Sequence, residues 1–260
     1  MKKILILSFL AVFLFSKEII LGVVPQQSPL KLSQKWLKIT EYLEQETGLN
    51  IVFKTKNSIP MFEEELYNGN YDLAYMNPYH FIIANNKQNY NALVRSNKNI
   101  VGILVAKDKD IELTKENLKD KTFLFPAPNA FAATLLTKYE LKEKLGLDLE
   151  KEAKILYVNS HDSVYKGIAR DIGYVGGGII RTYNNFKNHS DKENTNIVYK
   201  TADYPSHPIA YHPRMNKEDI EKIKKAFINM PEDLKSILSI KNFISTTTSD
   251  YDVIRNMNIK

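Results

Sequence analysis

Short apolar runs alternate with amphipathic segments along most of this chain. The runs at 18–24 and 71–76 have the length and composition of buried strands, whereas 32–47 repeats apolar residues at helical spacing. The alternation continues to the end of the chain without an internal repeat. Strands and helices in this order predict an α/β fold with a mostly parallel sheet.

Gly, Pro and Asn residues mark the ends of the predicted elements. Gly48 and Gly146 are expected to end two helices, and Asn129 is expected to cap the start of another. Strands are predicted at 18–24, 51–55, 71–76, 100–106, 122–125, 155–158, 197–199 and 209–211. Helices are predicted at 32–47, 58–66, from 77 onward, and at 130–145, 178–186, 216–227, 231–238 and 249–257. The polar stretch 188–196 is expected to be an exposed loop.

The first sixteen residues have the pattern of a secretory signal peptide. A basic start at 1–3 precedes the stretch 4–15, which is apolar except for Ser8 and too short for a comfortable membrane span. Cleavage is expected near Ser16, although Leu14 fits the small-residue rule for cleavage poorly. We therefore expect a soluble protein exported to the periplasm; an uncleaved membrane anchor is the alternative.

Composition excludes several kinds of site. The net charge is +6, or 34 − 30 = +4 without Lys2 and Lys3, and no dense basic stretch suggests nucleic acid as a partner. The chain has no cysteine, which excludes disulfides, thiolate metal sites, cysteine nucleophiles and a lipid anchor on cysteine. The five histidines show no metal-ligand spacing, so neither a metal nor another cofactor is expected.

Three predicted strands end in polar residues that open a helix. These places are Asn77-Pro78-Tyr79-His80, Pro128-Asn129 and the stretch 159–163. Ligands of open α/β sheets lie beyond the carboxyl ends of the strands, and helix starts offer unpaired N–H groups to an anion. The three helix starts therefore predict one shared site for an anion or a polar small molecule.

The stretch 159–178 is expected to form half of that site. It predicts a short amphipathic helix, a reversal at Arg170-Asp171, a short strand and then three glycines that allow close approach to the backbone. The glycines are no phosphate-binding P-loop, because no Gly-Lys-Ser/Thr follows; tight packing between lobes is their alternative role. His161, Asp162 and Ser163 are adjacent, so they cannot face one another as a hydrolytic triad.

Five stretches carry a resemblance to a known family. They keep their order and spacing over nearly the whole chain after the signal peptide and lie at 69–75, 118–123, 160–165, 171–173 and 209–213. In them the chain resembles the phosphonate/phosphate/phosphite-type substrate-binding proteins of bacterial ABC transporters. The resemblance implies a type II periplasmic binding fold, with two α/β lobes, a hinge and an interlobe ligand cleft. Lobe 1 would comprise 17–104 and 208–260, and lobe 2 would comprise 105–207.

One stretch departs from the family pattern. Well-known members carry a Ser/Thr-rich run at the start of the central helix, where hydroxyl groups bind a phosphonate. Here the sequence is Asn129-Ala130-Phe131-Ala132-Ala133-Thr134. Backbone N–H groups remain, but each missing hydroxyl bond removes about 0.5–1.5 kcal/mol. The ligand is therefore open between an oxyanion and a less charged, partly apolar molecule that Phe131 could stack against.

The candidate ligand-binding residues come from the helix starts, their neighbouring aromatic residues and the glycines. They are Tyr75, Asn77, Tyr79, His80, Asn129, Ala130, Phe131, Ser160, His161, Ser163, Tyr165, Gly176 and Gly177. Asn77 has the alternative role of a helix cap before Pro78, and His161 that of a locally bonded residue at a helix start. No catalytic residue is predicted, because no activated nucleophile is visible.

These observations predict a monomeric periplasmic solute-binding protein that is not an enzyme. It would capture a small oxyanion or related polar ligand, such as a phosphate or phosphonate, between its lobes. It would then deliver the ligand to an ABC permease in the inner membrane. Signalling of the ligand state to a membrane sensor is the first alternative, and an exported enzyme is the second.

Overall fold

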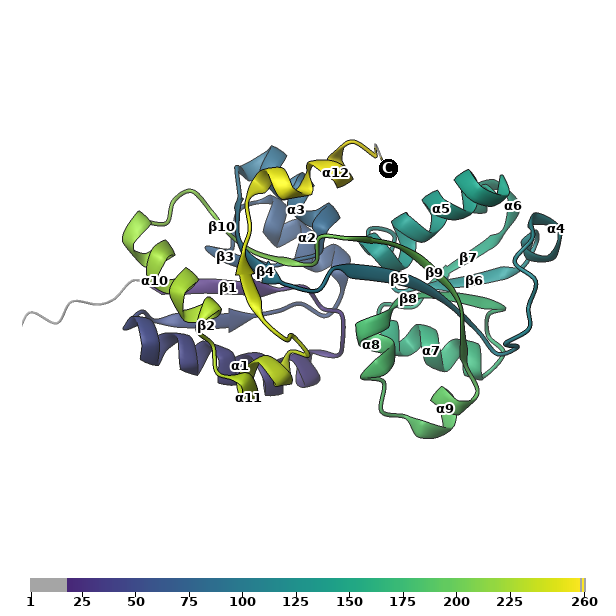
Figure 1. Cartoon of the computed structure of the whole chain (residues 1–260), viewed down its shortest axis with the longest axis horizontal. Coiled ribbons are helices and arrows are strands. Elements are labelled where there is room, and N and C mark those ends of the chain that lie inside the picture. Colours follow the sequence, from purple (N-terminus) through teal and green to yellow (C-terminus); the bar gives the residue numbers. More distant parts are fainter. Residues whose placement is uncertain (1–17, 258, 260) are drawn as a thin grey trace, which may run out of the picture.

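The computed structural model describes residues 18–257 and residue 259, and its strands form two separate sheets (Figure 1). The predicted signal peptide at 1–16 lies outside the described residues. The first sheet has the strand order β11-β4-β10-β3-β1-β2, and the second β7-β6-β8-β5-β9. The strands of the first sheet are β1 (Ile19–Val23), β2 (Ile51–Lys54), β3 (Leu73–Tyr75), β4 (Asn91–Ser96), β10 (Pro208–Tyr211) and β11 (Phe243–Ser245). Those of the second are β5 (Ile100–Ala106), β6 (Thr122–Phe125), β7 (Lys154–Tyr157), β8 (Val175–Ile179) and β9 (Asn196–Tyr204).

Helices cover both faces of each sheet (Figure 1). The helices around the first sheet are α1 (Pro29–Thr47), α2 (Ile59–Tyr67), α3 (Pro78–Gln88), α10 (Lys217–Ile228), α11 (Glu232–Ile237), the 3₁₀ turn η2 (Thr248–Tyr251) and α12 (Asp252–Arg255). Those around the second are α4 (Lys115–Leu118), η1 (Phe131–Leu135), α5 (Leu136–Leu145), α6 (Leu149–Glu152), α7 (His161–Ala169), α8 (Ile180–Asn184) and α9 (His189–Glu193). In the described part of the chain, no helix combines the length and the apolar character that crossing a bilayer requires.

The prediction of an α/β fold with two lobes is confirmed, but the prediction of mostly parallel sheets is wrong. Five of the nine strand pairings are antiparallel. Strand β10 lies between β3 and β4 and runs against both, and β5 runs against β8 and β9. The antiparallel pairings arise where the chain crosses from one sheet to the other. Strands β5 and β10 each enter their sheet directly from such a crossover rather than after a covering helix.

The chain passes between the two sheets twice. It leaves the first sheet after Ser96, joins the second at Ile100, and returns between Tyr204 and Pro208. We call 18–97 with 206–257 the first lobe, and 98–205 the second lobe. The first crossing therefore lies several residues before the predicted boundary at Leu104, because β5 pairs with β9 already from Ile100.

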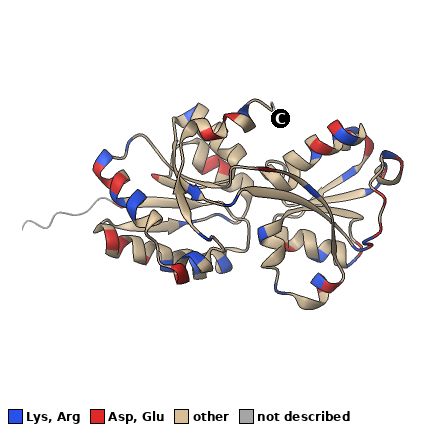
Figure 2. Ribbon diagram, in the orientation of Figure 1, with Lys and Arg blue, Asp and Glu red and all other residues tan. Residues whose placement is uncertain are grey.

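Apolar packing continues from one lobe into the other. The core of the first lobe includes the buried face of α1, with Trp36, Ile39 and Leu43. The same cluster includes Phe131 and Ile179 of the second lobe, whereas two further clusters lie wholly within the second lobe. Charged residues occupy mainly the outer helices and loops (Figure 2). The two lobes thus share part of one apolar cluster.

Three local predictions need correction. The three glycines do not follow a strand but form the middle of β8, with Gly176 and Gly177 buried in the sheet. Asn129 does not cap a helix with its side chain; the cap position is Ala130, and the first turn, η1, is a π-helix. The stretch 188–196 is not only a loop. It contains α9, because Asn188 caps the helix and the buried Asp191 pairs with Arg170 at 3.1 Å.

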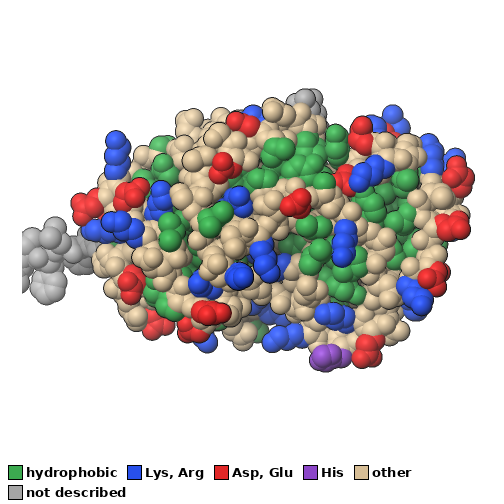
Figure 3. Space-filling view, viewed as in Figure 1, with side chains coloured by type: hydrophobic (Ala, Val, Ile, Leu, Met, Phe, Trp, Pro, Cys, Tyr) green, Lys and Arg blue, Asp and Glu red, His purple; other side chains and the backbone are tan. Residues whose placement is uncertain are grey.

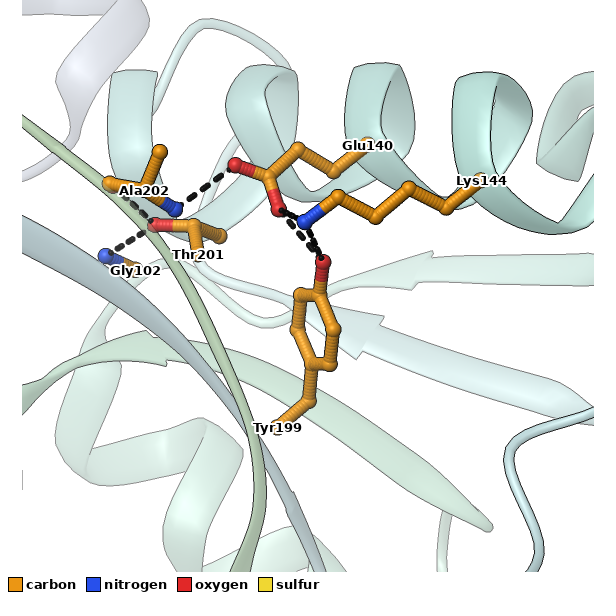
Figure 4. Close-up of polar contacts among 6 residues, drawn as sticks. All are labelled: Gly102, Glu140, Lys144, Tyr199, Thr201 and Ala202. Carbon is orange, nitrogen blue, oxygen red and sulfur yellow. Dashed lines mark hydrogen bonds and ion pairs between the residues drawn. The ribbon is translucent and has the colours of Figure 1, made fainter.

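A buried carboxylate connects α5 to the strand that leads back to the hinge (Figure 4). Glu140 is 4% exposed; its Oε1 accepts from the Ala202 N–H at 2.7 Å, and its Oε2 accepts from Lys144 Nζ at 2.7 Å and from the Tyr199 hydroxyl. At this point the register between β5 and β9 shifts, and Thr201 Oγ1 accepts from the Gly102 N–H at 2.9 Å. Glu140 therefore satisfies backbone and side-chain donors at an irregular part of β9.

Candidate functional site

Two of the predicted helix starts are joined by a hydrogen bond across the lobes. Asn77 caps α3, because its side-chain oxygen accepts from the His80 N–H at 2.8 Å. Its amide nitrogen donates to the carbonyl of Asn129, 3.0 Å away in the second lobe. The alternative role of Asn77 as a cap and its position between the lobes are therefore both observed, and one side chain serves both.

The third helix start opens onto the same place. Asn77 and His161 line one small cavity between the lobes, together with the start of η1. We call this space the interlobe cavity; its lining is Val24, Gln26, Ile59, Asn77, Ile100, Ala130, Phe131, Ala132, Ala133, His161, Ile179 and His207. Its volume is about 10 Å³, the space of roughly one water molecule.

The start of η1 offers backbone donors to the interlobe cavity. The five-residue-spaced bonds of this π-helix begin with the one from the Leu135 N–H to the Ala130 carbonyl at 3.3 Å, and the Leu136 N–H bonds to the Phe131 carbonyl next. Within the described residues, no acceptor is found for the N–H groups of Phe131, Ala132 and Ala133. Unpaired N–H groups at a helix start carry partial positive charge and attract anions.

Two glycines allow η1 to lie directly on the second sheet. A Cβ atom on Gly102 of β5 would lie 2.2 Å from the Ala132 carbonyl oxygen, and one on Gly177 of β8 would lie 2.0 Å from that of Ala133. Any larger residue would push the helix start away from the strands. Gly177 therefore positions the donors of η1 through packing.

His161 is a neutral hydrogen-bonding group at the start of α7. Its side chain is buried, and Ser160 caps the helix by accepting from the Ser163 N–H at 3.1 Å. Burial lowers the pKa of His161 to about 4, with the Asp162 carboxylate opposing this shift and the Arg181 guanidinium adding to it. The Nδ1 atom is buried without a partner among the described residues. A neutral imidazole has one N–H donor and one acceptor, so His161 can donate one hydrogen bond to an anion.

His207 contributes to the interlobe cavity and was not predicted as a site residue. Its Nε2 lies 2.9 Å from the amide nitrogen of Gln26, and its ring stacks on Tyr75 with a centroid distance of 5.3 Å. Burial, followed by the positive charge of Arg181, lowers the pKa of His207 well below its usual value. The neutral ring can accept a hydrogen bond from Gln26, which leaves the Gln26 carbonyl oxygen for another donor.

Arg181 is that donor and also links the lobes. Its Nη2 donates to Gln26 Oε1 at 3.2 Å, and its guanidinium carbon lies 6.0 Å from the Tyr75 ring centroid. A cavity of about 40 Å³ lies beside these residues and includes Lys35 in its lining. Burial and the nearby Arg181 lower the pKa of Lys35. Gln26, Arg181 and His207 have no distinctive sequence context, since they come from two loops and a short helix.

Further contacts hold the lobes together. Lys31 Nζ of α1 lies 2.5 Å from Asp162 Oδ2 of α7, and the Asn185 amide donates to Ser239 Oγ at 2.7 Å. Both join the first lobe to the second. The structure is therefore a closed arrangement, in which the helix starts of both lobes face a shared space.

The remaining predicted residues lie around this space in different settings. Tyr75 lines the 40 Å³ cavity, and Tyr79 packs half-buried against the core of the first lobe. His80 is fully buried, with Nε2 2.9 Å from Glu63 Oε1. Ser160 and Ser163 bond to each other at 2.9 Å.

Tyr165 and the glycines of β8 belong to the packing of the second lobe. The Tyr165 hydroxyl bonds to Thr182 Oγ1 at 2.7 Å and lies against Gly178, where a Cβ atom would approach it to 2.4 Å. Gly176 packs in the same way against Val164, at 2.5 Å. The atoms that approach these glycines closely are thus side-chain atoms of the second lobe.

A second, larger space lies between the lobes on the side of the crossovers. We call it the hinge-side cavity; its volume is about 250 Å³, and it is lined by Ser96, Lys98, Asn99, Ile100, Val101, Ile179, Ile180, Arg181, Asn184, Asn185, Ser206, His207 and Ser239. The face shown in Figure 3 is hollowed between the lobes, with Lys and Arg side chains at its edge. Across residues 18–257 no group of three or more His, Cys, Asp or Glu is placed to hold a metal ion.

Comparison with known proteins identifies the family. The family model described as "ABC transporter, phosphonate, periplasmic substrate-binding protein" matches residues 21–251. This chain belongs to that family. Members of the phosphonate-binding family are substrate-binding proteins rather than enzymes, and they are periplasmic. The resemblance noted in the sequence is confirmed.

Solved structures share the fold of this family member. PhnD1 from Prochlorococcus marinus, solved in complex with methylphosphonate, is 16% identical, with a TM-score of 0.84 over 93% of this chain and 97% of that one. A binding protein component of an ABC phosphonate transporter from Pseudomonas aeruginosa is 15% identical, with a TM-score of 0.81 over 93% and 85%. A Xanthomonas citri protein bound to ATP is 13% identical, with a TM-score of 0.69 over 93% and 96%. No curated protein matches the sequence.

Proposed function

We propose that this protein captures a small molecule with a phosphonate- or phosphate-type oxyanion group in the interlobe cavity and delivers it to an ABC permease of the inner membrane. The observation that carries the proposal is the convergence of polar groups from both lobes on one cavity. Three unpaired N–H groups of η1 and the His161 ring of the second lobe meet there, and Asn77 lines the cavity from the first lobe. The lining of the interlobe cavity contains no lysine or arginine. Hydrogen bonds and helix dipoles can bind an oxyanion in such a place.

No hydroxyl group of the central helix start is free for this task. The nearest one, on Thr134, is buried and donates to the Ala127 carbonyl at 2.8 Å. The backbone N–H groups of η1 and the His161 ring therefore take the place of the Ser/Thr run that the family resemblance implies. A tetrahedral oxyanion is larger than the space of one water, so it requires the lobes to stand slightly farther apart than in this structure.

Closure follows from which lobes the residues lining the cavity belong to. Asn77 belongs to the first lobe and His161 with η1 to the second, so only a closed form contacts the ligand from both sides. Binding therefore shifts the population toward closure. A permease that recognises the closed form would receive loaded protein, and a membrane sensor would read the same change.

Calorimetric titration and thermal denaturation test the proposal with phosphate, phosphite and methylphosphonate. We expect at least one of them to bind and to raise the midpoint of unfolding. A ligand present at 100 times its dissociation constant adds about 2.7 kcal/mol to the free energy of unfolding. His161→Ala should weaken binding at least tenfold. Lys225→Gln, on the exposed side of α10, is the matched control and should bind normally. Absence of binding by these three oxyanions and by phosphonates with a longer organic group would refute the proposal.

Delivery is a separate measurement. The ATPase activity of the candidate permease, reconstituted in lipid vesicles, should rise with ligand-loaded protein and not with ligand alone. Loaded protein that leaves the ATPase unchanged but alters the activity of a membrane kinase would assign the protein to sensing.

A further inference from the structure

The hinge-side cavity adjoins the interlobe cavity. Ile100, Ile179 and His207 line both spaces, so one molecule can extend from the first into the second. The hinge-side cavity is about 250 Å³, and the interlobe cavity is about 10 Å³. A bare oxyanion would leave the larger space to water, whereas a ligand with an organic arm would occupy both.

The charged side chains in the lining of the hinge-side cavity are all positive. It includes two cationic side chains, Lys98 and Arg181, and among its lining residues there is no carboxylate. Between residues 18 and 257 neither cation forms an ion pair. Asp203 lies outside the lining, and its Oδ2 accepts from the Asn99 amide at 2.8 Å.

Neutral polar groups complete the lining. Three asparagine amides and the hydroxyls of Ser96 and Ser239 are hydrogen-bonding groups of the lining, whereas the Ser206 hydroxyl donates to the Ser96 carbonyl at 3.2 Å. The apolar part of the lining comes from Ile100, Val101, Ile179 and Ile180. Arg181 uses Nη2 on Gln26 and has further N–H donors of the kind that bind carboxylates in pairs. Apolar walls suit methylene groups, and the unpaired cations suit a negative charge.

We propose that the ligand of this protein carries a second anionic group, such as a carboxylate, on a short organic arm that occupies the hinge-side cavity. The inference rests on the proposed oxyanion site and adds the chemical class of the substrate. Arg181 and Lys98 bind the second anionic group, and the asparagine amides select for acceptors on the arm. The same charges disfavour an arm that ends in an amine, because no carboxylate of the lining compensates it.

Titration calorimetry with matched ligands tests the arm. The probes are methylphosphonate, 3-phosphonopropionate and 3-aminopropylphosphonate, which share the phosphonate and differ at the other end. We expect 3-phosphonopropionate to bind at least tenfold more tightly than methylphosphonate, and the aminopropyl compound to bind more weakly than either. The preference for the carboxylate should weaken between 50 and 300 mM salt, since charge attraction at a partly open cavity is screened.

Variants of the lining provide a second readout. Arg181→Gln and Lys98→Gln should each lower the ratio of the carboxylate ligand's affinity to that of methylphosphonate by about tenfold. Asn184→Asp introduces a carboxylate of the same shape and should raise the affinity for the aminopropyl compound relative to the carboxylate compound. Lys225→Gln, far from the cavity on α10, should leave all three affinities as in the wild type.

The outcomes separate the two proposals. If the carboxylate compound binds no better than methylphosphonate, or the aminopropyl compound binds best, the second-anion inference is overturned and the oxyanion site stands. If no phosphonate or other oxyanion binds, the oxyanion site fails and the inference fails with it. A folded Arg181→Gln or Lys98→Gln variant, with an unchanged circular-dichroism spectrum and melting midpoint, could also lose all ligand binding. That result would contradict the inference that these residues contact only the arm of the ligand.

Discussion

The amide of Asn77 donates to the main-chain carbonyl of Asn129, 3.0 Å away on the opposite lobe. The same side chain caps α3 through its oxygen, which accepts from the His80 N–H. One residue therefore begins a helix in the first lobe and holds the loop before η1 in the second. Its two roles are separable by substitution.

Asn77→Ser should keep the cap and remove the contact between lobes, whereas Asn77→Ala should remove both. We expect Asn77→Ala to lower the free energy of unfolding by about 1 kcal/mol, and Asn77→Ser by much less, because serine caps helices about as well as asparagine. Both should weaken oxyanion binding, because the bond that holds the Asn129 loop beside the N–H groups of η1 is lost. Urea denaturation and calorimetric titration measure the two effects. Equal stability loss in both variants would contradict the assignment of the cap.

Gly177→Ala should displace the start of η1. The added Cβ atom would lie 2.0 Å from the Ala133 carbonyl oxygen, which is backbone and can yield only by moving the helix start. Overpacking of this kind costs about 1–3 kcal/mol, and the displaced N–H groups should weaken ligand binding by at least tenfold. Crystallography of the variant would show the shift directly.

Gly48→Ala is the control for this substitution. Gly48 ends α1 with a φ of 69°, and a Cβ atom added there would meet no other atom within 4 Å. The substitution should cost about 1 kcal/mol through backbone strain alone and leave binding unchanged. Normal ligand affinity in Gly177→Ala would show that the helix start does not supply the donors.

Glu140→Gln should remove an acid-sensitive part of the stability. Burial raises the pKa of Glu140, but hydrogen bonds from Lys144, Tyr199 and the Ala202 N–H outweigh it and hold the pKa below its usual value of 4.5. The carboxylate therefore stabilises the fold fully above pH 4.5, and this contribution disappears as the pH falls through the lowered pKa. Denaturation at pH 3.5 and 7 should show that the free energy of unfolding differs less between the two pH values for the variant than for the wild type. An identical difference in both would contradict the role of the charge.

His161 should make the stability rise with pH in a higher range than Glu140 does. Its pKa falls from 6.5 to about 4 on folding, so the unfolded chain binds the proton between these values and the folded chain does not. Stability should therefore rise with pH across that window and level off above 6.5. At pH near 5, unfolding of His161→Gln should take up about one proton fewer than unfolding of the wild type, which reduces the slope by about 1.4 kcal/mol per pH unit.

His207 serves as the internal comparison for that measurement. It is also buried with a lowered pKa, so His207→Gln should reduce the slope by a similar amount. If neither substitution changes the slope of the free energy of unfolding against pH, the two histidine rings are in contact with water in the folded protein.

Local sequence determined the order of elements and several of their ends. Asn77 and Asn216 cap α3 and α10 with their own side chains, and Gly48 and Gly146 end α1 and α5 with positive φ angles. These features depend on a few neighbouring residues, so the chain shows them without its fold. The family motifs extended this reading to two lobes with a cleft, because the motifs keep their spacing along the chain.

The tertiary structure alone decided which side chains meet between the lobes. Gln26 contacts His207 and Arg181, which are 181 and 155 positions away in sequence. Such pairs arise from the two crossovers, and nothing in the neighbourhood of either residue encodes them. The glycines of β8 show the same limit of local patterns. Their sequence indicates close approach, but only the fold shows that Ala133 and Tyr165 make it.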